Sequence, residues 1–159
     1  MIVDCHAHFE PRMLDAAPVL AKMDAAGVDK VAMIPPMHDP MPETPERLLA
    51  VMRRVMRLPG GRVVGEVAHR AMLTADGDLR LPGKVFAFYA RPDNAAVAEL
   101  VRAHPDRFLG WIFLNPRADP SVLDELERWR SVSGMIGIKL HPHWHDYQTS
   151  LLGPILRRA

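Results

Sequence analysis

The first residues of the chain carry two imidazoles and a carboxylate at a spacing suited to metal binding. In Asp4-Cys5-His6-Ala7-His8 the polar residues are two apart, and residues two apart on a strand point to the same face. Two imidazoles on one face reach a single cation through metal–nitrogen bonds of about 2.0–2.1 Å. We therefore predict that His6 and His8 are ligands of a divalent metal. A purely structural pair of histidines is the alternative.

A second polar pattern lies near the end of the chain. In Gly137-Ile138-Lys139-Leu140-His141 the period of two places Lys139 and His141 on one face and the apolar residues on the other. A lysine in mid-strand is costly unless its ammonium reaches water or an acid. Three roles are open for Lys139: it orients an anionic substrate, it pairs with Asp4, or it is carboxylated and bridges two metals.

Other polar residues follow the predicted strands and are weaker candidates. We expect His143 and His145 to lie in a loop, where a solvated histidine is the commoner outcome. The remaining candidates are His38, Asn115, Tyr89 and Arg91, the last two as ligands of a carboxylate. The chain has no glycine-rich phosphate loop, nucleophile elbow or Cys-x-x-Cys motif.

Composition excludes several classes of partner. A net charge of +1 argues against a nucleic-acid-binding protein, which carries a basic excess. No apolar run reaches the roughly 18 residues of a membrane span, so we expect no membrane partner. Cys5 is the only cysteine, and the N-terminus lacks the regions of a signal peptide. A cytoplasmic protein that acts on a small molecule is the expectation.

The elements that must position these residues alternate between strands and helices. Near-continuous apolar strands are predicted at residues 2–6, 28–34, 108–114 and 135–141, with a shorter strand at 85–89. Amphipathic helices are predicted over 15–27, from 44 to about 58, over 62–72, from 93 to about 104, from 119 to about 130, and from 149. Residues 74–83 read as a polar loop. Strands of this kind alternating with helices predict an α/β fold with a parallel sheet.

Several segments resemble the amidohydrolase superfamily. They are Ile2-Val3-Asp4-Cys5-His6-Ala7-His8, Ala26-Gly27-Val28-Asp29-Lys30-Val31, His104-Pro105-Asp106-Arg107-Phe108-Leu109-Gly110 and Gly137-Ile138-Lys139-Leu140-His141-Pro142. Their order and spacing are similar to the amidohydrolase-related branch of metal-dependent hydrolases, lactonases and decarboxylases. The likeness spans residues 1–159 as one domain, with an apparent insertion at about 58–91.

The resemblance implies a TIM-barrel-like fold and a metal, most often zinc, held by His6 and His8. It implies that the metal activates water, with Lys139 and His141 as catalytic residues that orient a carboxylate-bearing substrate. Asn115 and His143 are the expected substrate-binding residues. A metal-dependent decarboxylase and a non-catalytic relative are the alternatives.

Length limits this resemblance. A TIM barrel takes about 250 residues, whereas this chain has 159 and four predicted barrel strands. We expect an incomplete barrel of about half the usual size with a helical insertion. Half a barrel leaves two open sheet edges, so the sequence predicts either a homo-oligomer or a fragment of a longer chain.

Overall fold

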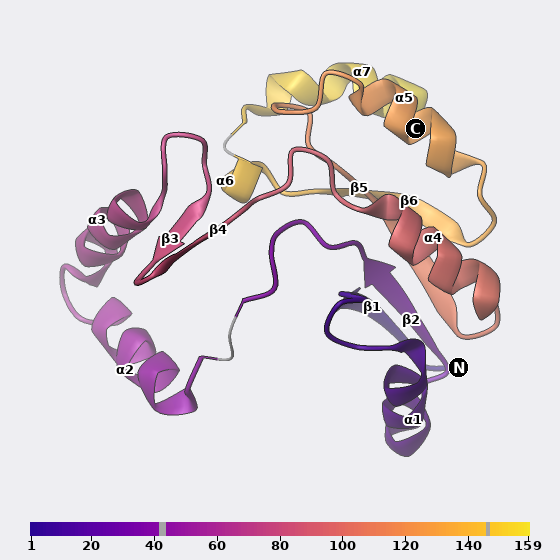
Figure 1. The fold of residues 1–159 in the computed structure, drawn as a ribbon, viewed down its shortest axis with the longest axis horizontal. Coiled ribbons are helices and arrows are strands. Elements are labelled where there is room, and N and C mark those ends of the chain that lie inside the picture. The colour runs from indigo at the N-terminus through magenta and orange to yellow at the C-terminus, as the bar shows by residue number, and fades with distance from the viewer. Residues whose placement is uncertain (42–43, 146) are drawn as a thin grey trace. The chain divides into compact units, whose positions relative to one another are not determined.

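The computed structural model describes residues 1–41, 44–145 and 147–159, although the side chains of His69, His143 and Trp144 lie outside this description. Its main element is a sheet with the strand order β1-β2-β5-β6, in which every neighbouring pair is parallel (Figure 1). These strands are β1 (Val3–His8), β2 (Lys30–Ile34), β5 (Phe108–Leu114) and β6 (Met135–Leu140). The parallel α/β prediction is confirmed, and the sheet is consistent with part of a TIM-barrel-like fold.

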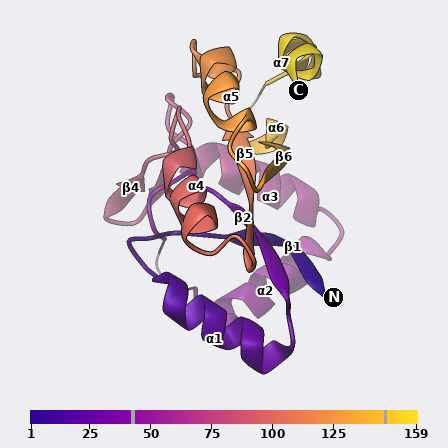
Figure 2. The ribbon, with the colours of Figure 1, turned by 90° about the vertical axis from the view of Figure 1, so that its right-hand side faces the viewer.

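Helices connect the strands and bury one face of the sheet. They are α1 (Ala16–Ala26), α4 (Asn94–Ala103), α5 (Val122–Arg130) and α7 (Gly153–Arg158), with a 3-10 helix η1 (Thr149–Leu152) before α7 (Figure 2). The core combines Val31 and Met33 of β2 with Phe108, Ile112 and Leu114 of β5 and the helical residues Val97, Val101, Leu126 and Ile155. Apolar side chains at every second strand position form this face, as the sequence pattern predicts.

The chain divides into two compact units by its internal contacts. The sheet and its helices form unit 1, residues 1–38 and 89–159, and residues 39–88 form unit 2. Unit 2 contains α2 (Glu46–Met56), α3 (Gly61–Met72) and the antiparallel strands β3 (Leu79–Leu81) and β4 (Lys84–Phe86). The insertion expected at about 58–91 thus falls mostly within unit 2, which also includes α2.

Two local expectations about these segments were wrong. Residues 74–83, read as a loop, include strand β3, which turns into β4 through Gly83 at φ +84°. Three residues are too few to show a period-two pattern, so β3 was missed, whereas β4 overlaps the strand predicted at 85–89. Residues 142–145, also expected to be a loop, form a short helix, α6 (Pro142–His145).

The boundaries of α1 show how the sequence ends one element and starts the next. Gly27 adopts a left-handed conformation at φ 67°, and its amide donates to the carbonyls of Asp24 and Met23. A residue with a Cβ rarely adopts this conformation, which is why glycine is favoured here. The chain then enters β2. Among the described helices, none is long and apolar enough to cross a membrane.

Candidate functional site

The imidazoles of His6 and His8 lie side by side at the carboxyl end of β1. Their ring centroids are 5.4 Å apart, with an edge-to-face angle of 61°. The register between β1 and β2 shifts between Asp4 and Ala7, so an irregularity lies inside this strand. Asp4 accepts a hydrogen bond from the His6 backbone amide at 2.9 Å, and no Asp4–Lys139 ion pair is found between described residues. The Asp4–Lys139 pair that we considered is therefore not formed here.

Basic side chains from three strand ends surround His8. Partial burial of the ring is the largest cause that lowers the pKa of His8, and together with the nearby groups His6, Lys139, His38 and His141 it brings the pKa from 6.5 to about 4. At neutral pH the ring is uncharged, and a neutral imidazole has the free lone pair that a metal requires.

Trp111 and Gly137 lie on the sheet face that carries Lys139. Trp111 donates from Nε1 to the backbone oxygen of Cys5 at 3.1 Å, so its side chain reaches from β5 across to β1. Gly137 is its register partner on β6, and a Cβ added there would lie 2.7 Å from Trp111 Cζ3. The absence of a side chain at Gly137 leaves room for this indole. Lys139, two residues further along, lies nearer the carboxyl end of the same face.

Asn115, a predicted substrate-binding residue, is buried and engaged in its own loop. Its Oδ1 accepts from the backbone amides of Arg117 at 3.3 Å and Ala118 at 3.4 Å. These contacts order the loop after β5 and occupy the amide oxygen. His143, the other predicted substrate-binding residue, lies in α6, and its side chain is outside the described residues.

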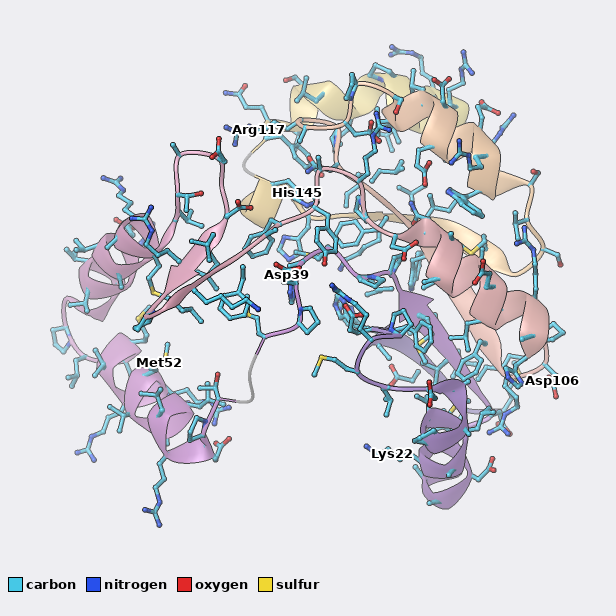
Figure 3. The ribbon with its side chains drawn as sticks, in the orientation of Figure 1. Lys22, Asp39, Met52, Asp106, Arg117 and His145 are labelled. Carbon is cyan, nitrogen blue, oxygen red and sulfur yellow. The ribbon has the colours of Figure 1, made fainter. Side chains whose placement is uncertain are left out.

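His145 is buried in a way that the sequence did not reveal. The residue is 6% exposed, and neither Nδ1 nor Nε2 has a hydrogen-bond partner in the described part of the chain. Its ring lies 5.5 Å from that of Phe113 and 6.4 Å from that of Tyr147, centroid to centroid. Burial lowers the pKa of His145 to about 4, with a smaller effect from His141. The expectation of a solvated loop histidine is wrong (Figure 3).

A small pocket of about 300 Å³ follows the ends of β1 and β2. Arg12 donates from Nε and Nη2 to the two oxygens of Glu10 at 2.8 and 2.7 Å, and from Nη2 to the Tyr89 hydroxyl at 2.7 Å. These hydrogen bonds hold the pKa of Glu10 below its usual value. The Tyr89 hydroxyl, expected to bind a substrate carboxylate, thus bonds to Arg12.

Arg91, the other expected carboxylate ligand, forms an internal ion pair. Its Nε lies 3.0 Å from Oδ1 of the buried Asp119. Sequence reasoning missed the contacts of Glu10 and Arg12 and ranked His38 low. The signal available in the sequence was their position in the loops that follow the first two predicted strands, because parallel sheets collect functional side chains at that end.

The donors present fit part of a metal site. His6 and His8 supply two adjacent imidazoles, a ligand type that zinc accepts. Within residues 1–41, 44–145 and 147–159, no group of three or more histidine, cysteine or acidic side chains is arranged to hold a metal ion. A catalytic zinc usually has three protein ligands, so this pair by itself is one ligand short of such a site.

Comparison with known proteins gives one result that bears on this site. A family model described as Amidohydrolase matches residues 3–158, nearly the whole chain. Neither the comparison with curated proteins nor that with solved structures found a match. The matched region contains both sheet edges, the His6–His8 pair and Lys139. The chain belongs to the amidohydrolase superfamily.

Proposed function

We propose that this protein is a metal-dependent hydrolase that acts on a small, carboxylate-bearing substrate. The observation that carries the proposal is the His6–His8 pair, with ring centroids 5.4 Å apart at the carboxyl end of β1. Parallel α/β folds place their active sites at this end of the strands. The match to a family that generally uses divalent metals supports the same assignment.

His6 and His8 would hold the metal, which we propose to be zinc. A bound zinc lowers the pKa of water and polarises a carbonyl group. The low pKa of His8 keeps its ring neutral at pH 7, so coordination does not have to displace a proton.

Lys139 and His141 are the residues we assign to substrate orientation. Lys139 is half-buried on β6, and both residues lie close enough to His8 to affect its pKa. A carboxylate near the Lys139 ammonium would be held by a charge-assisted hydrogen bond, which is roughly twice as strong as a neutral one. This places the substrate carboxylate toward β6 and the scissile group toward β1.

Metal binding by the full chain tests the proposal directly. We expect isothermal titration with Zn²⁺ to show a site whose affinity falls by more than about tenfold when His6 and His8 are both changed to alanine, because weakening an outer-shell contact alone costs about 10–100-fold. His104→Gln is the matched control. His104 follows α4 and its ring contacts Phe108, at the opposite end of β5, so this variant should bind Zn²⁺ normally.

Equal affinity of the double variant and the native chain would contradict the metal assignment. With Zn²⁺ bound, a panel of small lactones and aromatic carboxylates then distinguishes the reactions. Acid release from a lactone supports hydrolysis, whereas carbon dioxide release from a carboxylate supports the decarboxylase alternative. If Zn²⁺ has no effect and no substrate of the panel is turned over, the result supports the alternative that the protein is a non-catalytic relative.

A further inference from the structure

Unit 2 exposes the apolar faces of both its helices. On α2 the exposed apolar side chains are Leu48, Val51, Met52 and Met56, and on α3 they are Val63, Val64 and Val67, each at least 50% exposed. No described residue of α2 is fully buried. Scattered apolar residues are normal on a protein surface, but contiguous apolar stripes on two successive helices mark an interaction site. Met52 is labelled on α2 in Figure 3.

The same two helices are strongly basic. Residues 46–72 contain six arginines and two glutamates. Arg53 pairs with Glu46 at 2.7 Å and Arg62 with Glu66 at 3.2 Å. The other four arginines have no carboxylate partner among the described residues; they are Arg47, Arg54, Arg57 and Arg70. An excess of uncompensated positive charge therefore accompanies the apolar stripes.

The arginines of α2 flank its apolar stripe. At about 100° per residue, the apolar side chains of α2 occupy one side of the helix, and Arg47 and Arg53 lie just beyond its two borders. A long arginine side chain at such a border keeps its charge in the polar layer while its stem covers apolar surface. Cationic residues beside an apolar face characterise helices that lie in a membrane interface.

We propose that α2 and α3 form a docking surface for an anionic lipid bilayer. The apolar stripes enter the boundary between headgroups and acyl chains, and Arg47, Arg54, Arg57 and Arg70 contact the anionic headgroups. Charge complementarity selects this occupant, because a second copy would bring the same arginines against one another. Nucleic acid would satisfy the arginines and leave the apolar stripes in water. We expected no membrane partner because no apolar run is long enough to span a bilayer, but a helix that lies on the surface needs no such run, and the proposal departs from that expectation.

Vesicle flotation of the full chain tests the proposal. We expect binding to vesicles of palmitoyl-oleoyl phosphatidylcholine and phosphatidylglycerol at a ratio of 3:1, and little binding to phosphatidylcholine alone. Added salt should weaken the binding, because it screens exposed charges.

A pair of variants with the same charge change separates the apolar contribution from the electrostatic one. Met52→Glu places a carboxylate in the stripe, and Ala50→Glu places one on the polar side of α2. The first should lose at least about tenfold in binding, since it removes apolar burial and adds a negative charge. The second should lose no more than about fivefold, since it only adds the charge.

Four outcomes would overturn the proposal. They are no binding to the anionic vesicles, equal binding to both vesicle types, equal losses in the two variants, and a native dimer that Met52→Glu converts to a monomer. The last would identify a second copy as the occupant. Should Met52→Glu fail to fold by circular dichroism, the Arg47→Gln/Arg54→Gln variant keeps the stripe intact. Unchanged binding of that variant to anionic vesicles would equally refute the proposal.

Discussion

At the residue scale, His145 shows how a buried imidazole ties stability to pH. Its pKa is about 4 in the folded chain and 6.5 in the unfolded chain. Between these values the unfolded state binds the proton and the folded state does not, so stability falls as the pH drops from 6.5 toward 4. By this linkage the loss is about 2 kcal/mol at pH 5.

Replacement of His145 by phenylalanine should remove this dependence. The variant also removes two buried ring nitrogens that lack partners in the described region, which cost about 1–3 kcal/mol when unsatisfied. We expect His145→Phe to be no less stable than the native chain at pH 7.5. Between pH 7.5 and pH 5 the stability difference should shift by about 2 kcal/mol in favour of the variant. Urea unfolding at the two pH values measures this difference, with His104→Gln as the control. If the free energy of unfolding fell equally for the native chain and the variant between pH 7.5 and pH 5, His145 would not titrate as described.

The sequence predicted some of these residues and missed others for an identifiable reason. The spacing of His6 and His8 is a local pattern, so the sequence showed that their rings share a face. The environment of His8 depends on His38 and His141, which reach it only through the order of the strands. His145 is buried against Phe113 and Tyr147, and no spacing rule reports such a contact.

At the element scale, the fit between β5 and β6 depends on one missing side chain. A Cβ added at Gly137 would lie 2.7 Å from Cζ3 of Trp111. The indole cannot easily move away, because its hydrogen bond to the Cys5 backbone restrains it. Gly137→Ala should therefore destabilise the chain by about 1–3 kcal/mol, the usual cost of overpacking. Denaturant unfolding measures this cost.

A double-mutant cycle separates this clash from a loss of backbone freedom. In the Trp111→Leu background the alanine has room, so Gly137→Ala should then cost at least about 1 kcal/mol less, within the range of coupling seen for residues in contact. Equal costs in both backgrounds would mean that the indole does not constrain β6.

The sequence predicted some helices and strands better than others. The strands of unit 1 are long apolar runs closed by turns, such as Phe108–Leu114, and their pattern predicts them well. The hairpin of β3 and β4 has three-residue strands held by their mutual pairing, a tertiary property. The helix predicted over 62–72 is confirmed as α3, although its valines also have a preference for strands.

At the scale of the whole molecule, the core of unit 1 is independent of residues 39–88. The main apolar cluster has no member from that segment. The ends of the segment are tied together: the amide of Tyr89 donates to the Met37 oxygen at 2.7 Å, and the amide of Asp39 donates to the Ala87 oxygen at 3.0 Å. A three-residue connection can therefore replace the segment without straining either end.

We expect a chain in which Gly-Ser-Gly joins His38 to Tyr89 to unfold in one cooperative step and to be no less stable than the native chain. Each halving of a loop lowers its closure cost by about 0.6 kcal/mol, and the shortened chain keeps the described core of unit 1. Calorimetry tests the cooperativity, and Zn²⁺ titration tests the site on the same sample. A shortened chain that folds but loses Zn²⁺ affinity would place a metal ligand within residues 39–88. A shortened chain that loses its cooperative unfolding transition would show that unit 1 needs unit 2 in order to fold. Units 1 and 2 would then form a single cooperative folding domain.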